Sequence, residues 1–474
     1  MDKSFLNRLP IYFLIFFSFL TRFWQLYFPQ KVVFDETHFA LYANKYFSNE
    51  YYFDVHPPLG KMIFAFLLYF FGSKINFDFK VGNFYPNLDY LLLRSFVALL
   101  GSILPILVYF LLIKMKFSQR ASFLASFLII FDNALLVQSR FILLDIVLVF
   151  FIFLSLLLFF LQKDKKTFSF SWYLLNFLLA ISISFAISIK FSGFGVLAMI
   201  LFLEIIEGRI LSKSKKEIFW RLFFILLLPL FIYFFISFLH LKILYKICIS
   251  DCGYVYDYLI QKHIRELPKE ERGKQYELFY YPPKGKIFSQ IFLLSYQMLL
   301  TNAAINEGFY YASKWYFWPF LIRPVLYFKE KIDGNERFIF LLGNPIVWWF
   351  SILGVVFSLY YVLRKYILEK RPVYFQNENF RIFYLGYFIY LLPFAAISRF
   401  TLLYHYFPAL LFSIIIFSIS FDFFLRRLKI DNFLFFLFLF IVFLSFIFFA
   451  PLSYGFPLSF SQLQTRLWLP TWYF

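Results

Sequence analysis

Stretches of about 20 mainly apolar residues recur along most of this chain, separated by short polar segments. A helix of that length rises about 1.5 Å per residue, which is enough to cross the roughly 30 Å hydrocarbon core of a bilayer. Apolar residues make up 62% of the 474 positions and charged residues only 15%, too few to cover a soluble fold with a polar shell. The sequence therefore predicts an all-α polytopic membrane protein. It excludes a water-soluble enzyme, a disordered chain and a disulfide-rich secreted scaffold.

Eleven stretches are predicted to cross the membrane. They are residues 9–28, 90–113, 120–138, 141–161, 172–189, 191–206, 219–241, 343–364, 382–398, 402–421 and 432–451. The fifth and sixth are separated only by Lys190 and the Ser192–Gly193 pair, so one bent element is the alternative interpretation. The apolar run 62–71 is too short to cross and predicts an interfacial or re-entrant helix.

Basic residues divide unequally between the two sides that this count defines. With a cytoplasmic N-terminus, the cytoplasmic segments hold 21 Lys and Arg residues, and the three short outer turns hold one each. This bias supports the orientation and places the loops 29–89 and 242–342 and the tail 452–474 outside. The excess of basic residues in the cytoplasmic segments also accounts for the net charge of +19, so no nucleic-acid partner is needed to explain it. We divide the chain into transmembrane modules 1–241 and 343–474 and the outer loop region 242–342.

Ionisable residues in or beside the predicted spans gather toward the outer side, where charge is costly and therefore a candidate for function. They are Arg22, Arg94, Asp132, Asp145, Lys190, Arg399 and His405. Structural ion pairs or snorkelling side chains are the alternative. The first outer loop is the densest region, with Asp35–Glu36, His38, Asp54 and His56. An acidic pair at this place suits a general base or a metal site, and the first turn of a helix is the alternative.

This loop resembles the first-loop signature of the protein O-mannosyltransferases, reading FDETHFALYANKYF and then YYFDVHPPLGK. The resemblance continues in family order along most of the chain. Its later motifs are QSRFILLD at 138–145, ISIKFSGFG at 187–195, YASKWYFWPFLIRPVLYF at 311–328, GNPIVWW at 343–349 and YHYFPAL at 404–410. The family uses dolichyl- or polyprenyl-phosphate mannose as its donor. The resemblance therefore implies a GT-C glycosyltransferase fold and transfer of mannose to Ser/Thr hydroxyls of secreted or membrane proteins.

The resemblance also implies roles for particular residues. Asp35 is the expected catalytic acid–base residue, with Glu36 as its companion. The resemblance and the placement of charges together assign donor phosphate and sugar binding to Arg22, Arg94, Lys190, Arg399 and His405. They assign acceptor binding to Trp315, Trp318 and Asn302. His38, Asp54 and His56 complete the loop motif. The loop 242–342 is too short for the β-trefoil domains of the eukaryotic members, Asn302 stands about where the family often has a histidine, and Cys248 and Cys252 match nothing in the pattern.

The predicted chemistry is a single inverting displacement. A carboxylate accepts the proton of the acceptor hydroxyl, and cations stabilise the leaving lipid phosphate. A retaining reaction would need a second carboxylate, which Glu36 could supply. No metal is expected to be obligatory, although a divalent cation is possible. The alternative enzyme transfers another sugar from a polyprenyl phosphate to lipid A or a surface glycan, and a transporter or scaffold is the non-enzymatic alternative. We expect the plasma membrane of a prokaryote, with the active site outside.

Overall fold

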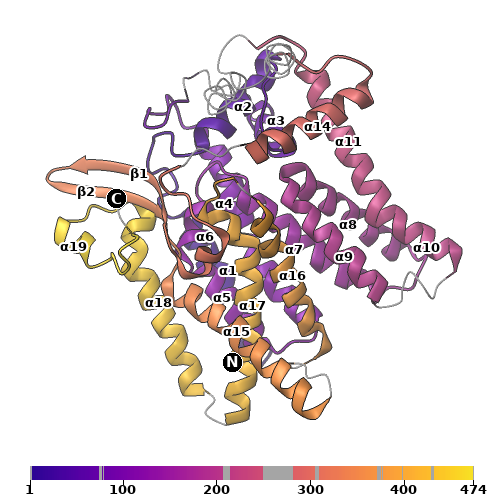
Figure 1. The fold of residues 1–474 in the computed structure, drawn as a ribbon. Helices are drawn as coiled ribbons and strands as arrows, with labels where there is room; N and C mark the ends of the chain where they lie inside the picture. Colours follow the sequence, from indigo (N-terminus) through magenta and orange to yellow (C-terminus); the bar gives the residue numbers. More distant parts are fainter. Residues whose placement is uncertain are drawn as a thin grey trace.

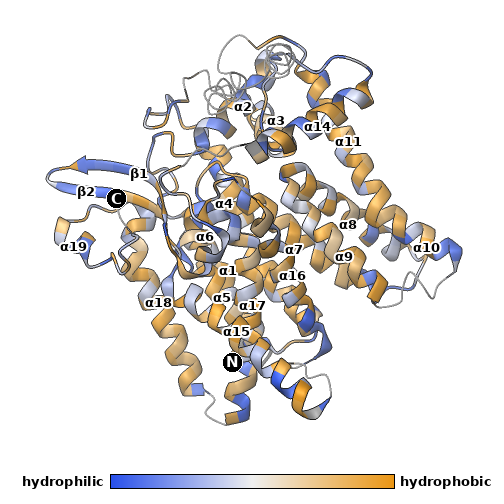
Figure 2. Ribbon diagram, in the orientation of Figure 1, coloured by the Kyte–Doolittle hydropathy of each residue, from blue (hydrophilic) through white to orange (hydrophobic). Residues whose placement is uncertain are grey.

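Long apolar helices make up most of the computed structural model, and they run side by side with the polar loops gathered at their ends (Figures 1 and 2). The structure describes residues 3–73, 77, 79–206, 214–248, 281–304, 309–370, 375, 377–397, 399–428 and 432–472. Cys252 lies outside these residues.

Seven helical stretches among the described residues are long and apolar enough to cross a membrane. They are α4 (Tyr90–Lys114), α7 (Asp145–Gln162), α8 (Phe170–Ile189), the continuous run of α10 (Lys215–Leu222), η2 (Phe223–Leu227) and α11 (Leu228–Ile243), α15 (Pro345–Glu369), η6 (Leu403–Tyr406) with α17 (Phe407–Leu428), and α18 (Asn432–Tyr454). Multiple membrane spans are thus confirmed.

Shorter apolar helices occupy the other predicted spans. They are α1 (Lys3–Phe23), α5 (Gln119–Ile130), η1 (Phe191–Gly193) with α9 (Phe194–Ile206), and α16 (Arg381–Leu391) with η5 (Leu392–Ala396). The total of eleven spans stays a prediction. The remaining helices are α2 (Glu36–Ser48), α3 (Leu59–Phe70), α6 (Asn133–Gln138), α14 (Ile287–Ala304), η3 (Trp315–Phe320), η4 (Glu378–Phe380) and α19 (Phe460–Gln464).

The predicted third span, 120–138, is wrong as a single helix. Its backbone leaves the helical conformation at Asp132, which adopts an extended conformation and accepts a hydrogen bond from the Leu135 amide. This is the geometry of an N-cap, so a second short helix, α6, begins there. The predicted fourth span, 141–161, begins later than expected, at Asp145. Residues 139–144 therefore form a turn rather than the end of a span.

The fifth and sixth predicted spans are two elements rather than one bent helix. Lys190 lies between them in an extended conformation, with φ −148° and ψ 145°, and the 3₁₀ turn η1 follows it. An extended residue interrupts the hydrogen-bond ladder and lets the next helix leave in a new direction. The interruption also places the Lys190 side chain at the end of a helix instead of along its side.

The helices of the first outer loop, α2 and α3, lie together at one end of the bundle, far from the start of α1 (Figure 1). A hairpin, β1 (Val325–Ile332) and β2 (Asn335–Leu341), lies at the side of this end beside the C-terminal tail. The two strands pair antiparallel around Asp333–Gly334, and a backbone bridge joins Glu336 to Leu458. The hairpin is an addition to the predicted all-α fold.

A buried polar network joins the break before α6 to α15. The two Asp132 carboxylate oxygens accept from the amides of Leu135 and Asn344 and from the Trp348 indole, at 2.7–2.9 Å. Asn344 in turn caps α15 and donates to the Phe131 carbonyl. Since these groups have no access to water, each must be satisfied within the protein.

Asp132→Ala is therefore expected to destabilise the fold. It leaves three buried donors without an acceptor, at a cost of about 1–3 kcal/mol for each such group. The thermal unfolding midpoint in detergent measures the loss. Ser351→Ala on α15 is the matched control, because the buried Ser351 hydroxyl has no hydrogen-bond partner among the described residues and its removal should change little. Equal midpoints for the two variants would contradict the role given to Asp132.

Candidate active site

The two neighbouring acids of the first loop point to different places. Glu36 is the first residue of α2, and Asp35 is its N-cap residue, with φ −72° and ψ −2°. The Asp35 side chain makes no capping hydrogen bond. The sequence left open whether this pair is only the acidic start of a helix. The pair does stand at a helix start, but Glu36 is paired with Arg94 and Asp35 lines a cavity.

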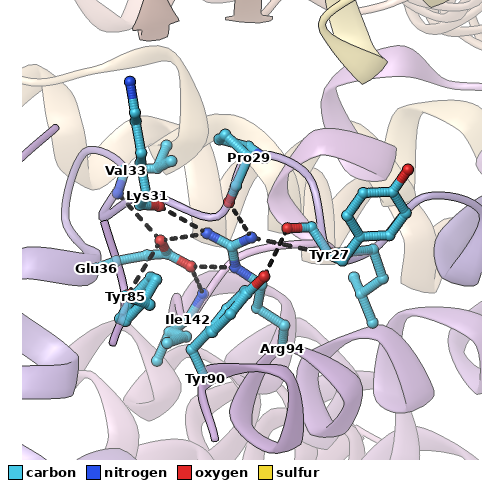
Figure 3. A network of polar contacts seen from close by, with 10 residues as sticks. Tyr27, Pro29, Lys31, Val33, Glu36, Tyr85, Tyr90, Arg94 and Ile142 are labelled. Atoms are coloured by element: carbon cyan, nitrogen blue, oxygen red, sulfur yellow. Dashed lines mark hydrogen bonds and ion pairs between the residues drawn. The ribbon is translucent and has the colours of Figure 1, made fainter. Parts of the chain in front are cut away.

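Glu36 forms a buried ion pair with Arg94 of α4 (Figure 3). The Arg94 guanidinium donates to both carboxylate oxygens, at 2.8 and 2.7 Å, in a bidentate arrangement. Both side chains are fully buried. The same carboxylate also accepts from the amides of Val33 and Ile142, at 3.1 and 3.0 Å. Every strong acceptor site of Glu36 is therefore used within the protein.

The other donors of Arg94 bind the loop that leads from α1 to α2 (Figure 3). They reach the carbonyls of Pro29 and Lys31, at 2.8 and 3.1 Å. The guanidinium also lies near the ring of Tyr90, 4.7 Å from its centroid. The structure thus places Arg94 and Glu36 away from the cavity described next. It gives Arg94 no free N–H group for a donor phosphate.

A cavity of about 580 Å³ lies beside α2. Six of the residues predicted for the site line it, namely Asp35, His38, Asp54, His56, Arg399 and His405. The other lining residues are Phe34, Thr37, Phe39, Leu41, Val55, Phe79, Lys80, Val81, Phe309, Leu326, Tyr327, Phe400, Leu402 and Tyr404. The cavity thus brings together the first loop, the hairpin and the segment before α17, which are far apart in the sequence.

Asp35 is the acid in this region whose carboxylate keeps its bonding capacity for a ligand. Among the described residues, no side chain or amide donates a hydrogen bond to it. The acids around it are all paired: Glu36 with Arg94, Asp54 with Lys61 at 2.5 Å, and Asp145 with Lys190 at 2.6 Å. An unpaired carboxylate at a cavity wall can accept a proton from a bound molecule.

Burial raises the pKa of the Asp35 carboxyl from 3.8 to about 7. The positive charge of Lys190 opposes this shift, while the negative charges of Asp145 and Asp54 add to it. Desolvation and like charges both disfavour the carboxylate, so its proton affinity approaches that of imidazole. A base with a pKa near the working pH is well suited to proton transfer.

Two histidines of the loop motif line the same cavity in the neutral form. Burial lowers the pKa of His38 to about 4, and the charge of Asp54 raises it only in part. Burial also lowers the pKa of His56 well below its ordinary value, together with the charges of Lys190 and Lys61. A neutral imidazole offers one donor and one acceptor, which suits hydrogen bonds to sugar hydroxyls.

Arg399 is the arginine that the structure places at the cavity. It interacts with the Asn302 side-chain oxygen and, at 2.9 Å, with Nε2 of His405. Trp318 is fully buried and stacks behind His405, with ring centroids 6.0 Å apart. Trp318 and Trp315 do not line the cavity, so the predicted contact between these tryptophans and an acceptor is not part of this geometry.

Lys190 and Arg22 differ in their relation to the cavity. Lys190 is held by Asp145 and lies 5.2 Å from the ring centroid of Tyr404, a cavity residue. Arg22 is buried at the end of α1, where it donates to the carbonyls of Ile129 and Ile130, each at 2.8 Å. Arg22 therefore fastens α1 to α5 and does not line the cavity.

Several cavity residues were not singled out from the sequence. Tyr327 and Phe34 stack on one another, with ring centroids 4.4 Å apart. Tyr327 stands within the aromatic motif at 311–328, where the sequence does not distinguish it from the neighbouring aromatic residues. Across the described part of the chain, no group of three or more His, Cys, Asp or Glu side chains is placed to hold a metal.

Comparisons with known proteins identify the family of this chain. Residues 12–245 match the family described as dolichyl-phosphate-mannose-protein mannosyltransferase, and residues 287–472 match the C-terminal four-transmembrane region of protein O-mannosyltransferases. The chain belongs to the protein O-mannosyltransferase family. The segment 12–245 that matches the first of these carries Asp35, Glu36 and Arg94, so the family resemblance predicted from the first-loop motif is confirmed.

Relatives with assigned names cover part of the chain. Protein O-mannosyl-transferase 2 of Danio rerio is 34% identical over 50% of this chain and 33% of its own length. Dolichyl-phosphate-mannose–protein mannosyltransferase 4 of Candida albicans is 32% identical over 47% of this chain and 32% of its own length. The match thus spans about a third of these relatives.

Solved structures share the fold over a longer range. The S. cerevisiae protein O-mannosyltransferase Pmt1-Pmt2 complex bound to the sugar donor matches with a TM-score of 0.81 and 19% identity, over 100% of this chain and 93% of that one. An oligosaccharyltransferase of Archaeoglobus fulgidus matches with a TM-score of 0.53 and 14% identity, over 98% of this chain and 58% of that one. The predicted GT-C fold is confirmed.

The Glu36–Arg94 geometry predicts a loss of stability when one partner is removed. Arg94→Met or Glu36→Leu leaves a buried unpaired charge, which costs about 3–5 kcal/mol. We expect a lower unfolding midpoint and yield for each single variant, and a double variant that loses less than the sum of the two. An Arg94→Met protein with the wild-type midpoint but a raised KM for the lipid donor would show instead that Arg94 contacts the phosphate.

Proposed function

We propose that this protein transfers mannose from a dolichyl or polyprenyl phosphate to serine or threonine hydroxyls of secreted or membrane proteins. Family membership and the names of its relatives support this activity. The observation that carries the proposal is the Asp35 carboxylate, which is unpaired among the described residues, faces the cavity and has a pKa of about 7. A hydroxyl acceptor needs such a base, because it is a poor nucleophile at neutral pH.

The reaction is a single displacement with inversion. Asp35 accepts the proton of the acceptor hydroxyl as its oxygen forms a bond to the anomeric carbon. The bond from this carbon to the phosphate oxygen breaks, and the lipid phosphate leaves with the electron pair. Because Glu36 is used by Arg94, no second free carboxylate stands beside Asp35 among the described residues to form a covalent sugar intermediate.

Arg399 and Lys190 supply the positive charge for the leaving phosphate. Arg399 lines the cavity, and His405 and Asn302 orient its guanidinium. Lys190 lies beside Tyr404, and its positive charge favours the charged form of the Asp35 carboxyl. A guanidinium stays charged at any working pH and matches the geometry of phosphate oxygens. A metal ion is not needed for this charge.

We also propose the orientation of the protein in the plasma membrane of a prokaryote. The excess of Lys and Arg in alternate loops supports a cytoplasmic N-terminus. This orientation puts α2, α3 and the cavity at the outer face, where a lipid-linked sugar and a translocated polypeptide can meet. Membrane lipid surrounds the apolar helices. The choice between a dolichyl and another polyprenyl carrier belongs to this proposal.

Asp35→Asn tests the role of the base. The amide keeps the shape of the side chain but has no useful basicity, so mannose transfer from dolichyl-phosphate mannose to a Ser/Thr peptide should fall by about 10²–10⁴. Donor binding and folding should be retained. Asp89→Asn is the control, because Asp89 lies in the same loop but is only partly buried and does not line the cavity. A near wild-type transfer rate for Asp35→Asn would falsify the proposal.

The raised pKa also predicts a pH dependence. Since the carboxylate is the active form, transfer should rise as pH increases through about 7, with about one tenth of the plateau rate at pH 6. The folded pKa lies above the unfolded value, so this acid costs stability as pH rises from about 4 to 7. Asp35→Asn removes this cost, and its unfolding midpoint at pH 8 should be no lower than that of the wild type. A flat rate between pH 6 and 8 would contradict the assignment.

A further inference from the structure

We infer that Tyr327 is a positioning residue that fixes Asp35 and Lys190 relative to each other. This inference rests on the proposed function and adds a specific residue to it. Tyr327 lies on β1, is 3% exposed and lines the cavity. Its ring contacts the residue before Asp35, while its hydroxyl begins a hydrogen-bond chain that ends at Lys190.

The ring of Tyr327 supports a strained backbone next to the base. Phe34 has a φ of +45°, in the left-handed region that bulky side chains rarely adopt. Such a conformation persists only where the surroundings hold it. The Phe34 ring stacks on Tyr327 with centroids 4.4 Å apart and planes 11° apart, and it also meets the edge of the Tyr404 ring at 6.3 Å. Asp35 follows directly, so the stack sets where its carboxylate points.

The hydroxyl of Tyr327 holds the cation through two intermediates. It donates to Oε1 of Gln138 at 2.6 Å, and Nε2 of Gln138 donates to Oδ2 of Asp145 at 2.9 Å. The other Asp145 oxygen accepts from Nζ of Lys190 at 2.6 Å. The bond from Tyr327 fixes which end of the Gln138 amide faces Asp145, and therefore keeps a donor, not an acceptor, beside the carboxylate.

A hydrogen-bond chain of this kind matters more for the position of a lysine side chain than for that of an arginine. The ammonium group is a point charge at the end of four flexible methylenes, so its position depends on its partners. Gln138, Asp145 and Lys190 are all buried, which makes their hydrogen bonds directional and strong. Lys190 is thereby held at a fixed place near Tyr404, where its charge acts on Asp35.

The strand that carries Tyr327 is itself anchored. Glu330 on β1 pairs with Lys31 of the first loop at 2.8 Å, and β2 is bridged to the tail at Leu458. A positioning residue needs a rigid element behind it. The hairpin supplies one and connects it to the same loop that carries Asp35.

The groups around Asp35 that carry or can carry charge come from every neighbouring element. They are Asp54, His38, His56, Lys80, Asp145, Lys190, Tyr327, Arg399, Tyr404 and His405. Burial and the charges of Asp35 and Asp145 raise the pKa of Tyr327 well above its ordinary value. The phenol therefore stays protonated and remains a donor to Gln138 throughout the working pH range.

The test compares Tyr327→Phe, Gln138→Leu and the double variant, with purified protein, dolichyl-phosphate mannose and a Ser/Thr peptide. Tyr327→Phe keeps the ring and removes only the hydroxyl. We expect kcat to fall about tenfold, the usual scale for one buried hydrogen bond. The rise of activity with pH should move upward by about half a unit or more, because a less fixed Lys190 favours the Asp35 carboxylate less. Adding Tyr327→Phe to Gln138→Leu should cause little further loss.

Tyr384→Phe is the matched control, since the Tyr384 hydroxyl also donates a 2.6 Å hydrogen bond, to Ser358, outside the cavity. It should lose stability without a shift of the pH profile. The inference is overturned if Tyr327→Phe has the same pH profile as this control, or if the effects of the Tyr327 and Gln138 changes simply add. Asp35→Asn is measured in parallel. An active Asp35→Asn protein refutes the proposed function, whereas an inactive one beside an unaltered Tyr327→Phe refutes only the role of Tyr327.

Discussion

The buried ion pair between Glu36 and Arg94 is the interaction on which the site depends. Two opposite charges taken out of water are costly unless each bonding position is filled. Here the guanidinium and the carboxylate bind each other and also four backbone groups, at Pro29, Lys31, Val33 and Ile142. The pair thus joins the loop between α1 and α2, helix α4 and the turn before α7 through a single set of contacts.

The position of Asp35 follows from this anchor. Successive residues of a helix point about 100° apart around its axis. Since Glu36 is directed into the core, its neighbour cannot point the same way, and Asp35 faces the cavity. The two adjacent acids therefore have different roles. Glu36 is paired with Arg94 and holds the loop, while Asp35 faces the cavity and has a raised pKa. Exchanging the two roles would require a rotation of α2, which the fully buried Arg94 does not allow.

The apolar stretches were enough to predict the bundle, because length and hydropathy alone decide whether a helix can cross a bilayer. They were not enough at Asp132, where a buried N-capping bond begins a second short helix within an apolar run. The hairpin had a readable signal in Asp333–Gly334 between two strands rich in β-branched and aromatic residues. In a chain so rich in aromatic residues this composition is not distinctive, so the strands were not predicted.

The site was predictable in its residue types more than in its pairings. Asp35, Arg399 and the loop histidines do meet at one cavity. Hydropathy cannot tell which of several cations pairs with which acid, because Arg22, Arg94 and Arg399 all stand near the outer ends of predicted spans. Their separation depends on the fold: Arg94 binds a carboxylate, Arg22 binds backbone carbonyls, and Arg399 lies at the cavity, where it contacts Asn302 and His405.

The bridge between the hairpin and the tail has a consequence for synthesis. Tyr327, Arg399 and His405 complete the cavity around Asp35. The hairpin is bridged to Leu458, and the Trp472 indole donates to the Leu321 carbonyl, just before β1. A ribosome-bound chain inserts its first helices long before these segments emerge. The Asp35 loop is therefore made before one wall of its cavity, and the cavity is complete only after the hairpin and the segment before α17 have been translated.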